Sequence, residues 1–226
     1  MRLAAALASL ALAQAASHDQ ALLASAREMR ARIAREELDP AADAKSLAAL
    51  AESCAADAHA SWAGQFPEAA TAKDRAKSLS SIGPAGAEAL YLEAVCTAAA
   101  ARMQGFTPLI ERRQELIDSF TRVSQLAPDL DGSGPDRELG ALYASLPAQA
   151  GGDLEEARKH LLAALTRSPD DPRNHLVLAR TVAVKAQDKA LFHEHLTIAA
   201  SSSDATTASQ ASALLQREED LFTAGP

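Results

Sequence analysis

Small and large apolar residues recur at helical spacing between residues 134 and 169, and this pattern predicts two antiparallel helices. A turn around 151–153 separates them. Asp153 is placed to cap the second helix, and Glu156 three residues later completes a capping-box pattern. Pro169 ends that helix. The apolar or small positions on the two faces are Leu139, Gly140 and Tyr143 in the first helix and Ala157, Leu161 and Ala164 in the second.

The same reasoning divides the rest of the chain into about ten helices, each bounded by Pro, Gly or capping residues. No run of alternating Val, Ile or Thr predicts a strand, and the abundance of Ala favours helix. The chain is therefore predicted to be all-α, with its longest loop at 129–135. The predicted helices span 17–37, 41–63, 67–81, 85–104, 108–126, 136–145, 153–169, 172–185, 188–200 and 208–222.

Successive helix pairs with small residues at their contacts are typical of tetratricopeptide (TPR) hairpins. The spacing of Phe120, Val123 and Pro128 repeats that of the last helix-and-proline segment of the 136–169 hairpin, which is the best-marked one. We therefore predict an irregular, TPR-like helical-hairpin solenoid that forms a single domain over 16–226. In such a solenoid the first helix of each hairpin lines the concave binding surface.

The N-terminal residues resemble a secretory signal peptide more than a part of the fold. Arg2 supplies the positive start, residues 3–12 form the apolar run, and residues 13–15 provide a small-x-small cleavage site. The apolar run is shorter than the roughly 20 residues that a membrane-spanning helix needs. We predict a signal peptide at 1–15, with cleavage after Ala15. An amphipathic first helix is the alternative, but no polar face appears before Gln14.

Charge and hydropathy restrict the classes of partner and the location that the protein can have. The net charge is −8 for the whole chain and −9 once the single Arg of the predicted signal is removed. An acidic surface without a basic stripe argues against nucleic acid. No segment of the mature chain combines transmembrane length with absence of charge. The first cysteine after the predicted cleavage site is Cys54, so a lipid-attachment cysteine is not encoded there. These observations predict a periplasmic or secreted protein.

Motifs for catalysis, metals or cofactors are not found. His193 and His195 flank Glu194, but residues two apart on a helix point in nearly opposite directions and cannot hold one ion. No HExxH, CxxC or GxSxG pattern occurs, and the GSGP segment lacks the strand and the Lys of a phosphate loop. We predict a non-enzymatic protein with no catalytic residue, metal or cofactor.

Cys54 and Cys96 are the only cysteines. An even number allows one disulfide in an oxidising compartment, provided that the helices at 41–63 and 85–104 lie side by side. The alternative is two small apolar side chains buried on Ala-rich faces.

Polar and aromatic residues on first helices are the candidate binding residues. Arg offers a fixed fork of donors for carboxylates, and Tyr offers rigid contact area with a polar tip. Tyr143 suits hairpin packing better than ligand contact, and Trp62 suits the end of its helix better than a ligand site. For Arg137 the alternative is a first-turn surface position. The candidate ligand or partner contacts are Tyr91, Arg102, Arg137, Tyr143, His175 and Arg180.

Five segments, in this order and spacing, resemble the T-component family of tripartite ATP-independent periplasmic (TRAP) transporters. The resemblance runs from Tyr91 to Phe222, and the first 80 or so residues do not contribute to it. The family's usual lipidated cysteine has no counterpart here. The segments are GPDRELGALYASLP, GGDLEEARKHLLAAL, NHLVLA, QDKALFHEHL and ASALLQREEDLF.

The resemblance implies a periplasmic, TPR-like protein that assembles into oligomers, docks a substrate-binding protein and offers an apolar groove or conduit for a hydrophobic small ligand. A general periplasmic scaffold that binds peptides or partner proteins in its concave groove is the alternative. A continuous apolar tunnel favours the first hypothesis, whereas a solid core with an open polar groove favours the second.

Overall fold

The computed structural model describes residues 2–37 and 41–222, except for the side chains of residues 2–13 and 15. These residues form helices and connecting turns, and no strand occurs in the described ranges, which confirms the all-α prediction. The chain forms two compact units, unit 1 (Met1–Ala127) and unit 2 (Pro128–Pro226). The single domain predicted over 16–226 stays a prediction.

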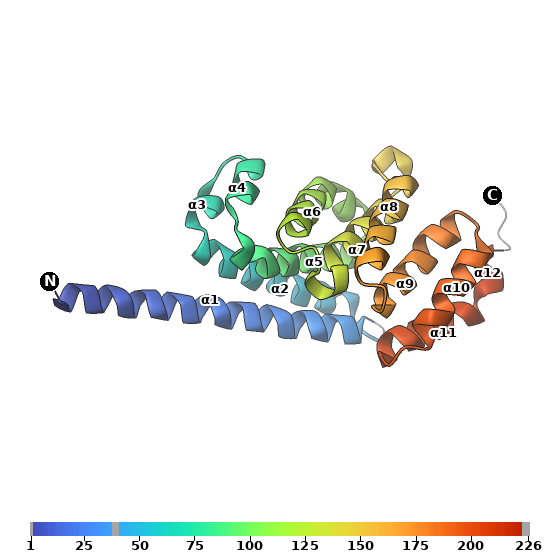
Figure 1. Ribbon diagram of the computed structural model, residues 1–226, viewed down its shortest axis with the longest axis horizontal. Helices are drawn as coiled ribbons and strands as arrows, with labels where there is room; N and C mark the ends of the chain where they lie inside the picture. The colour runs from blue at the N-terminus through green and yellow to red at the C-terminus, as the bar shows by residue number, and fades with distance from the viewer. Residues whose placement is uncertain (1, 38–40, 223–226) are drawn as a thin grey trace. The chain divides into compact units, whose positions relative to one another are not determined.

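The long helices of unit 1, α1, α2, α5 and α6, form a stack, and the shorter α3 and α4 lie between α2 and α5 in the chain. α2 packs against both α1 and α5, and α5 packs in turn against α6 (Figure 1). A 3₁₀ turn at Pro84–Gly86 leads into α5. The helices of this unit are α1 (Arg2–Glu36), α2 (Ala44–Gln65), α3 (Pro67–Thr71), α4 (Arg75–Ser81), α5 (Ala87–Gln104) and α6 (Phe106–Leu126).

The contact between α1, α2 and α5 is built largely from small side chains. Alanines and the two cysteines fill it, and Ile33 and Leu92 add bulk. Small residues let helix axes approach closely, so α5 is buried along most of its length. Cys54 on α2 and Cys96 on α5 are fully buried and joined as a disulfide, with their Cα atoms 5.9 Å apart.

Aspartate caps account for several helix boundaries that the sequence analysis placed wrongly. The predicted helix over 67–81 is two helices, because the Asp74 side chain accepts a hydrogen bond from the Lys77 N–H and starts α4. Asp43 likewise starts α2 at Ala44 instead of residue 41. Asp204 starts the penultimate helix at Ala205, within the segment predicted as a turn.

Unit 2 consists of shorter helices. α7 pairs with α8, and α10 packs against both α9 and α11. One turn of π-helix at Ala179–Ala183 continues α9. The helices are α7 (Leu130–Ser145), α8 (Leu154–Arg167), α9 (Pro172–Leu178), α10 (Lys189–Ala200), α11 (Ala205–Gln216) and α12 (Glu218–Phe222). Helical hairpins are consistent with the predicted solenoid.

α7 and α8 pack directly against each other, with Gly140 in the contact between them. A Cβ atom on Gly140 would lie 2.5 Å from Cγ of Leu161, so only glycine fits there. Asp153 does cap α8 through the N–H groups of Glu155 and Glu156. The predicted capping box does not form in full, because the Asp153 N–H donates instead to the Tyr143 carbonyl.

The predicted loop at 129–135 is compressed into a sharp left-handed bend at the start of α7. Asp131, Gly132 and Ser133 have φ values of 53°, 63° and 61°. Buried Arg137 donates from Nη1 to the carbonyl oxygens of Asp131 and Gly132. A Cβ atom on Gly132 would meet the Asp171 carboxylate at 1.8 Å, so this position requires glycine.

The first 15 residues, predicted as a signal peptide, lie partly outside the described residues. Residue 1 and the side chains of 2–13 and 15 are not described, and the backbone from Arg2 continues without a break into the rest of α1. Among the described residues, no helix has the length and apolar character that membrane crossing requires.

Candidate functional site

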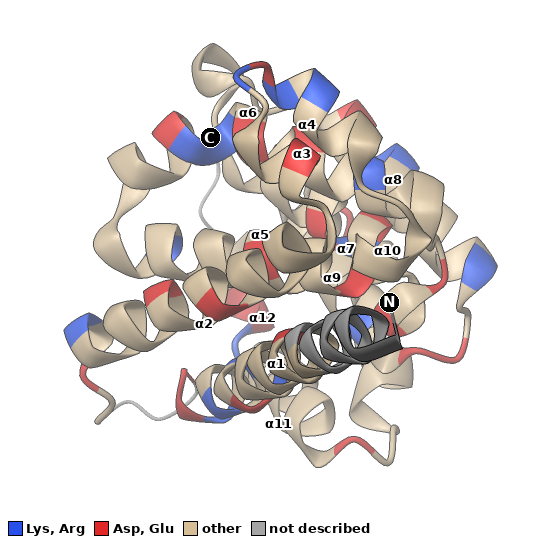
Figure 2. Ribbon diagram, turned by 90° about the vertical axis from the view of Figure 1, so that its left-hand side faces the viewer, with Lys and Arg blue, Asp and Glu red and all other residues tan. Residues whose placement is uncertain are grey.

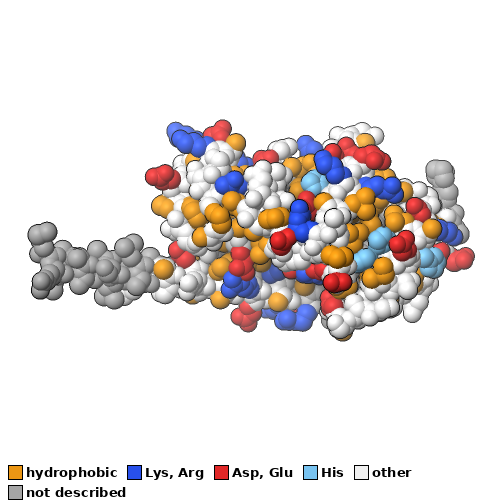
Figure 3. Space-filling model, in the orientation of Figure 1, with side chains coloured by type: hydrophobic (Ala, Val, Ile, Leu, Met, Phe, Trp, Pro, Cys, Tyr) orange, Lys and Arg blue, Asp and Glu red, His pale blue; other side chains and the backbone are white. Residues whose placement is uncertain are grey.

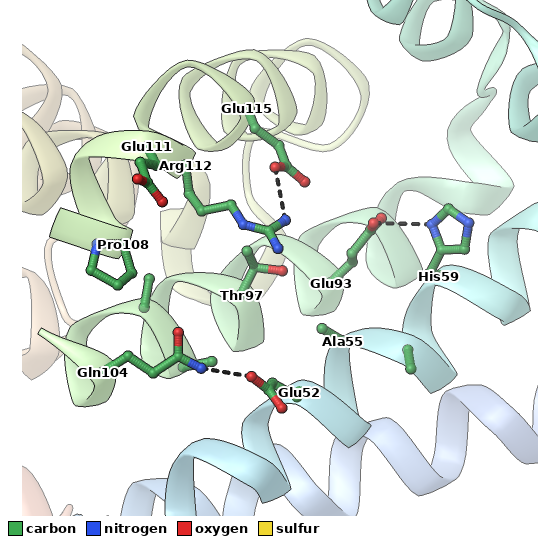
Figure 4. Close-up of a pocket in the computed structure, with 13 residues that line it drawn as sticks. Glu52, Ala55, His59, Glu93, Thr97, Gln104, Pro108, Glu111, Arg112 and Glu115 are labelled. Carbon is green, nitrogen blue, oxygen red and sulfur yellow. Dashed lines mark hydrogen bonds and ion pairs between the residues drawn. The ribbon is translucent and has the colours of Figure 1, made fainter. Parts of the chain in front are cut away.

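A groove of about 440 Å³ lies on unit 1, where α2, α5 and α6 come together (Figure 4). α2 contributes Glu52, Ala55, Ala56 and His59. α5 contributes Glu93, Thr97, Ala100, Ala101 and Gln104. α6 contributes Pro108, Glu111, Arg112 and Glu115.

The lining residues recur every three or four positions, so each helix turns one face toward the groove. Thr97, Ala100 and Ala101 form a floor of small side chains on α5. Longer polar side chains on α2 and α6 reach over this floor from either side (Figure 4). The groove therefore results from packing α2 and α6 on the two flanks of an alanine-rich helix.

Glu93 is the most constrained acid in the groove. Its Oε2 accepts a 2.6 Å hydrogen bond from Nε1 of Trp62, and its Oε1 lies 3.0 Å from Nδ1 of His59. Its side chain is 18% exposed, so it still faces the groove. The hydrogen bond with Glu93 raises the pKa of His59 above its usual value despite partial burial. Trp62, predicted to fasten the end of its helix, is buried near the end of α2 and also orients this carboxylate.

Four of the other polar side chains of the groove form two pairs. Gln104 Nε2 donates to Glu52 Oε1 at 2.6 Å, and Arg112 Nη1 lies 3.0 Å from Glu115 Oε2. The lining holds four glutamates against one arginine and one histidine. Acidic positions on α2 and α5 are visible in Figure 2. The groove is therefore polar and carries a net negative charge.

The six predicted binding residues do not line this groove. Tyr91 is buried, with its ring edge-on to Phe120 at 6.3 Å. Arg102 is exposed at the end of α5. Both residues belong to unit 1, on the helix that forms the floor of the groove.

Arg137, Tyr143, His175 and Arg180 belong to unit 2 and occupy separate positions there. Arg137 is 4% exposed, and besides the bend carbonyls its Nη1 donates to Oδ1 of Asn174. This guanidinium therefore holds the protein's own backbone. Arg180 is exposed in the π-helical turn.

Tyr143 and His175 contact neighbouring helices. The Tyr143 ring stacks on that of His160, at 5.9 Å between centroids and 4° between planes. His175 is buried and bonds through Nδ1 to Nδ1 of His195 at 2.8 Å. Burial, and then the neighbouring His175, lower the pKa of His195. The structure does not bring the four unit 2 candidates together into one site.

The sequence analysis did not single out the groove residues as candidates. The available signal was the three-to-four-residue spacing of small and polar residues that the segments 52–59 and 108–115 share. That spacing also suits an exposed face, and only the packing of both helices on α5 distinguishes the two interpretations.

Apolar exposure is limited on the described surface. The large apolar side chains exposed there are Phe106, Leu162 and Ile198, on α6, α8 and α10. Figure 3 shows hydrophobic side chains interspersed with charged ones on the face in view.

The described residues therefore form an all-α protein of packed helices, with an open polar groove on unit 1. The model of one family, TRAP transporter T-component, matches residues 48–222. The chain therefore belongs to the TRAP transporter T-component family, as its sequence resemblance indicated. The match begins within α2, before Tyr91, where the resemblance started. A comparison with curated proteins finds no match.

Proposed function

We propose that this protein is an exported, non-enzymatic component of TRAP transport that docks a substrate-binding protein in the groove on unit 1. Membership of the T-component family supports the link to transport. The observation that carries the docking surface is the groove itself, in which three helices each present one face to a shared opening. Family members act outside the cytoplasm, which is consistent with export.

The lining of the groove favours a protein surface over an apolar small ligand. Small-molecule pockets are usually lined by hydrophobic and aromatic side chains around a few polar groups. Here the apolar lining consists of four alanines and one proline, and the longer side chains are charged or polar. An open polar groove is the feature that favours a protein-binding scaffold over an apolar conduit, so the link to TRAP transport rests on family membership and not on this lining. A general periplasmic scaffold would bind its partners in the same groove, so the identity of the partner distinguishes a TRAP component from such a scaffold.

Export through a cleaved signal at 1–15 remains part of the proposal. A buried disulfide between Cys54 and Cys96 supports it, because structural disulfides persist in oxidising compartments. Expression with the full N-terminus, followed by intact-mass measurement of the secreted or periplasmic protein, should give a chain beginning at Ala16. A mature protein that retains residues 2–15 would contradict the signal assignment.

The docking proposal can be tested by narrowing the groove without changing its charge. Ala56 lines the groove on α2, and Ala60 lies one turn further along, exposed but outside the lining. The partner is the substrate-binding protein of the TRAP system from the same organism, and calorimetry measures the affinity. Ala56→Tyr should weaken binding at least tenfold, while Ala60→Tyr should bind as the unmodified protein does. Equal binding by both variants would rule out the groove as the docking surface.

A further inference from the structure

We infer that the groove on unit 1 receives a basic side chain, lysine or arginine, from the docked protein, with its cationic head at Glu93 and its stem along the alanine floor. This inference rests on the proposed function, since it takes the occupant to be a protein. It names the chemistry that the occupant must present.

The first support is the balance of charge across the three helices. Glutamates lie on every wall, and the arginine among the lining residues, Arg112, is already paired with Glu115. Glu111 lies exposed on the same helix. Acidic clefts with low-dielectric walls concentrate the field and attract cations. An acidic occupant would face like charge, and an apolar one would cover these carboxylates without supplying a hydrogen bond.

The second support is the geometry of Glu93. A carboxylate offers about four acceptor positions, and Trp62 and His59 hold one oxygen each. The remaining positions can accept from a further donor while these two side chains keep the carboxylate in place. A group that is already oriented loses little conformational freedom on binding, which favours a charge-assisted contact here.

The third support is the shape of the opening. Beside Glu93, Thr97, Ala100 and Ala101 form a floor of methyl groups on α5. Lysine and arginine bury an aliphatic stem while their charged heads reach a polar partner. A volume of about 440 Å³ is ample for one such side chain. An apolar floor ending at a fixed carboxylate therefore complements the two halves of a basic side chain.

The geometry favours an organic cation over a metal ion. In the described part of the chain, no three His, Cys, Asp or Glu side chains converge closely enough to hold a metal. The glutamates of the groove are instead distributed along its walls (Figure 4).

Short peptides provide a direct test. The probes are capped glycine pentapeptides with lysine, arginine, glutamate or norleucine at the centre. Binding to the full chain is followed by NMR, through the amides of Thr97 and Ala101 and the indole N–H of Trp62. The lysine and arginine peptides should produce saturable shifts that weaken as salt rises, because exposed charges are screened. The norleucine and glutamate peptides should bind at least tenfold more weakly.

Two charge-removing variants and a matched control complete the experiment. Glu93→Gln should weaken the lysine peptide about tenfold, the usual size of one charge-assisted contact. Glu111→Gln should weaken binding of the lysine peptide less, because this exposed residue adds to the negative potential of the groove without making a fixed contact. Glu28→Gln, exposed on α1 outside the groove, should change nothing. Unchanged NMR spectra away from the groove would show that the variants are folded.

Two results would overturn the inference. One is equal binding of the norleucine and lysine peptides. The other is the absence of a saturable shift with the lysine peptide at concentrations up to about 10 mM, since a dissociation constant above that concentration would be too weak for specific docking. If Ala56→Tyr still blocks the substrate-binding protein in either case, docking stands and only the basic side chain is wrong. If Ala56→Tyr has no effect, the proposed function itself fails.

Discussion

Reduction of the Cys54–Cys96 disulfide should destabilise unit 1 by several kcal/mol. The two cysteines lie 42 residues apart in the sequence, and the bridge ties α2 to α5 at the centre of the unit 1 core. In the chain-entropy model, closing a loop of this length removes enough freedom from the unfolded chain to stabilise the fold by about 4 kcal/mol.

The single tryptophan makes the measurement specific to this unit. Trp62 lies on α2 in unit 1, so its fluorescence reports the unfolding of that unit. Urea titrations are compared for oxidised protein and for protein reduced in denaturant and refolded with reductant. With a slope of about 2 kcal/mol per molar, the midpoint should fall by about 2 M urea. The Cys54→Ala/Cys96→Ala variant should behave like the reduced protein, with a small extra loss from the missing sulfur atoms.

Two outcomes would refute this reasoning. The first is a loss of less than about 1 kcal/mol on reduction, which would mean that the bridge hardly restricts the unfolded chain. The second is free thiol in oxidised, denatured protein, which would mean that the bridge does not form.

Three further predictions concern single side chains. NMR titration of His59 should give a pKa above about 6.5, and Glu93→Gln should return it there. The His59–Glu93 pair therefore contributes its full stabilisation below the ordinary pKa of histidine, and this contribution is lost as the pH rises through the pKa of His59 in the folded state. An unshifted pKa of His59 would contradict the pairing. Gly140→Ala should destabilise unit 2 by about 1–3 kcal/mol in urea, although this change normally favours a helix, because the added methyl overlaps a buried leucine. A gain in stability would show that the helices can separate. Arg137→Leu should cost unit 2 about 3 kcal/mol, while Arg158→Leu at an exposed position should cost almost nothing; equal losses would be inconsistent with a buried clamp.

Most helices could be predicted from the sequence because each carries its own local punctuation. Asp153, Pro172 and Asp188 start α8, α9 and α10 as expected. The boundaries were wrong where an aspartate caps a helix at a position that the surrounding sequence does not mark as a helix start. Asp74 and Asp204 have no distinguishing neighbours, and their role depends on the N–H groups that the folded chain presents to them.

The candidate site was less predictable, since its residues are far apart in the sequence and individually unremarkable. Glu52 and Glu115 look like solubilising charges until α2 and α6 are packed on the same helix. Arg137 shows the opposite error. It has the chemistry of a binding residue, but its guanidinium donates hydrogen bonds to carbonyl groups of the bend and to the Asn174 side chain inside unit 2. Local sequence does not indicate which arginine has such partners.

The left-handed bend at Asp131–Ser133 also constrains how the chain can vary in length. Each residue inserted in a helix rotates the remainder of that helix by about 100°. One residue added or removed between Arg137 and the bend would turn Gly140 away from α8 or detach the guanidinium from its carbonyls. A segment whose composition suggests a tolerant linker thus acts as a spacer of set length, and indels are better accommodated elsewhere.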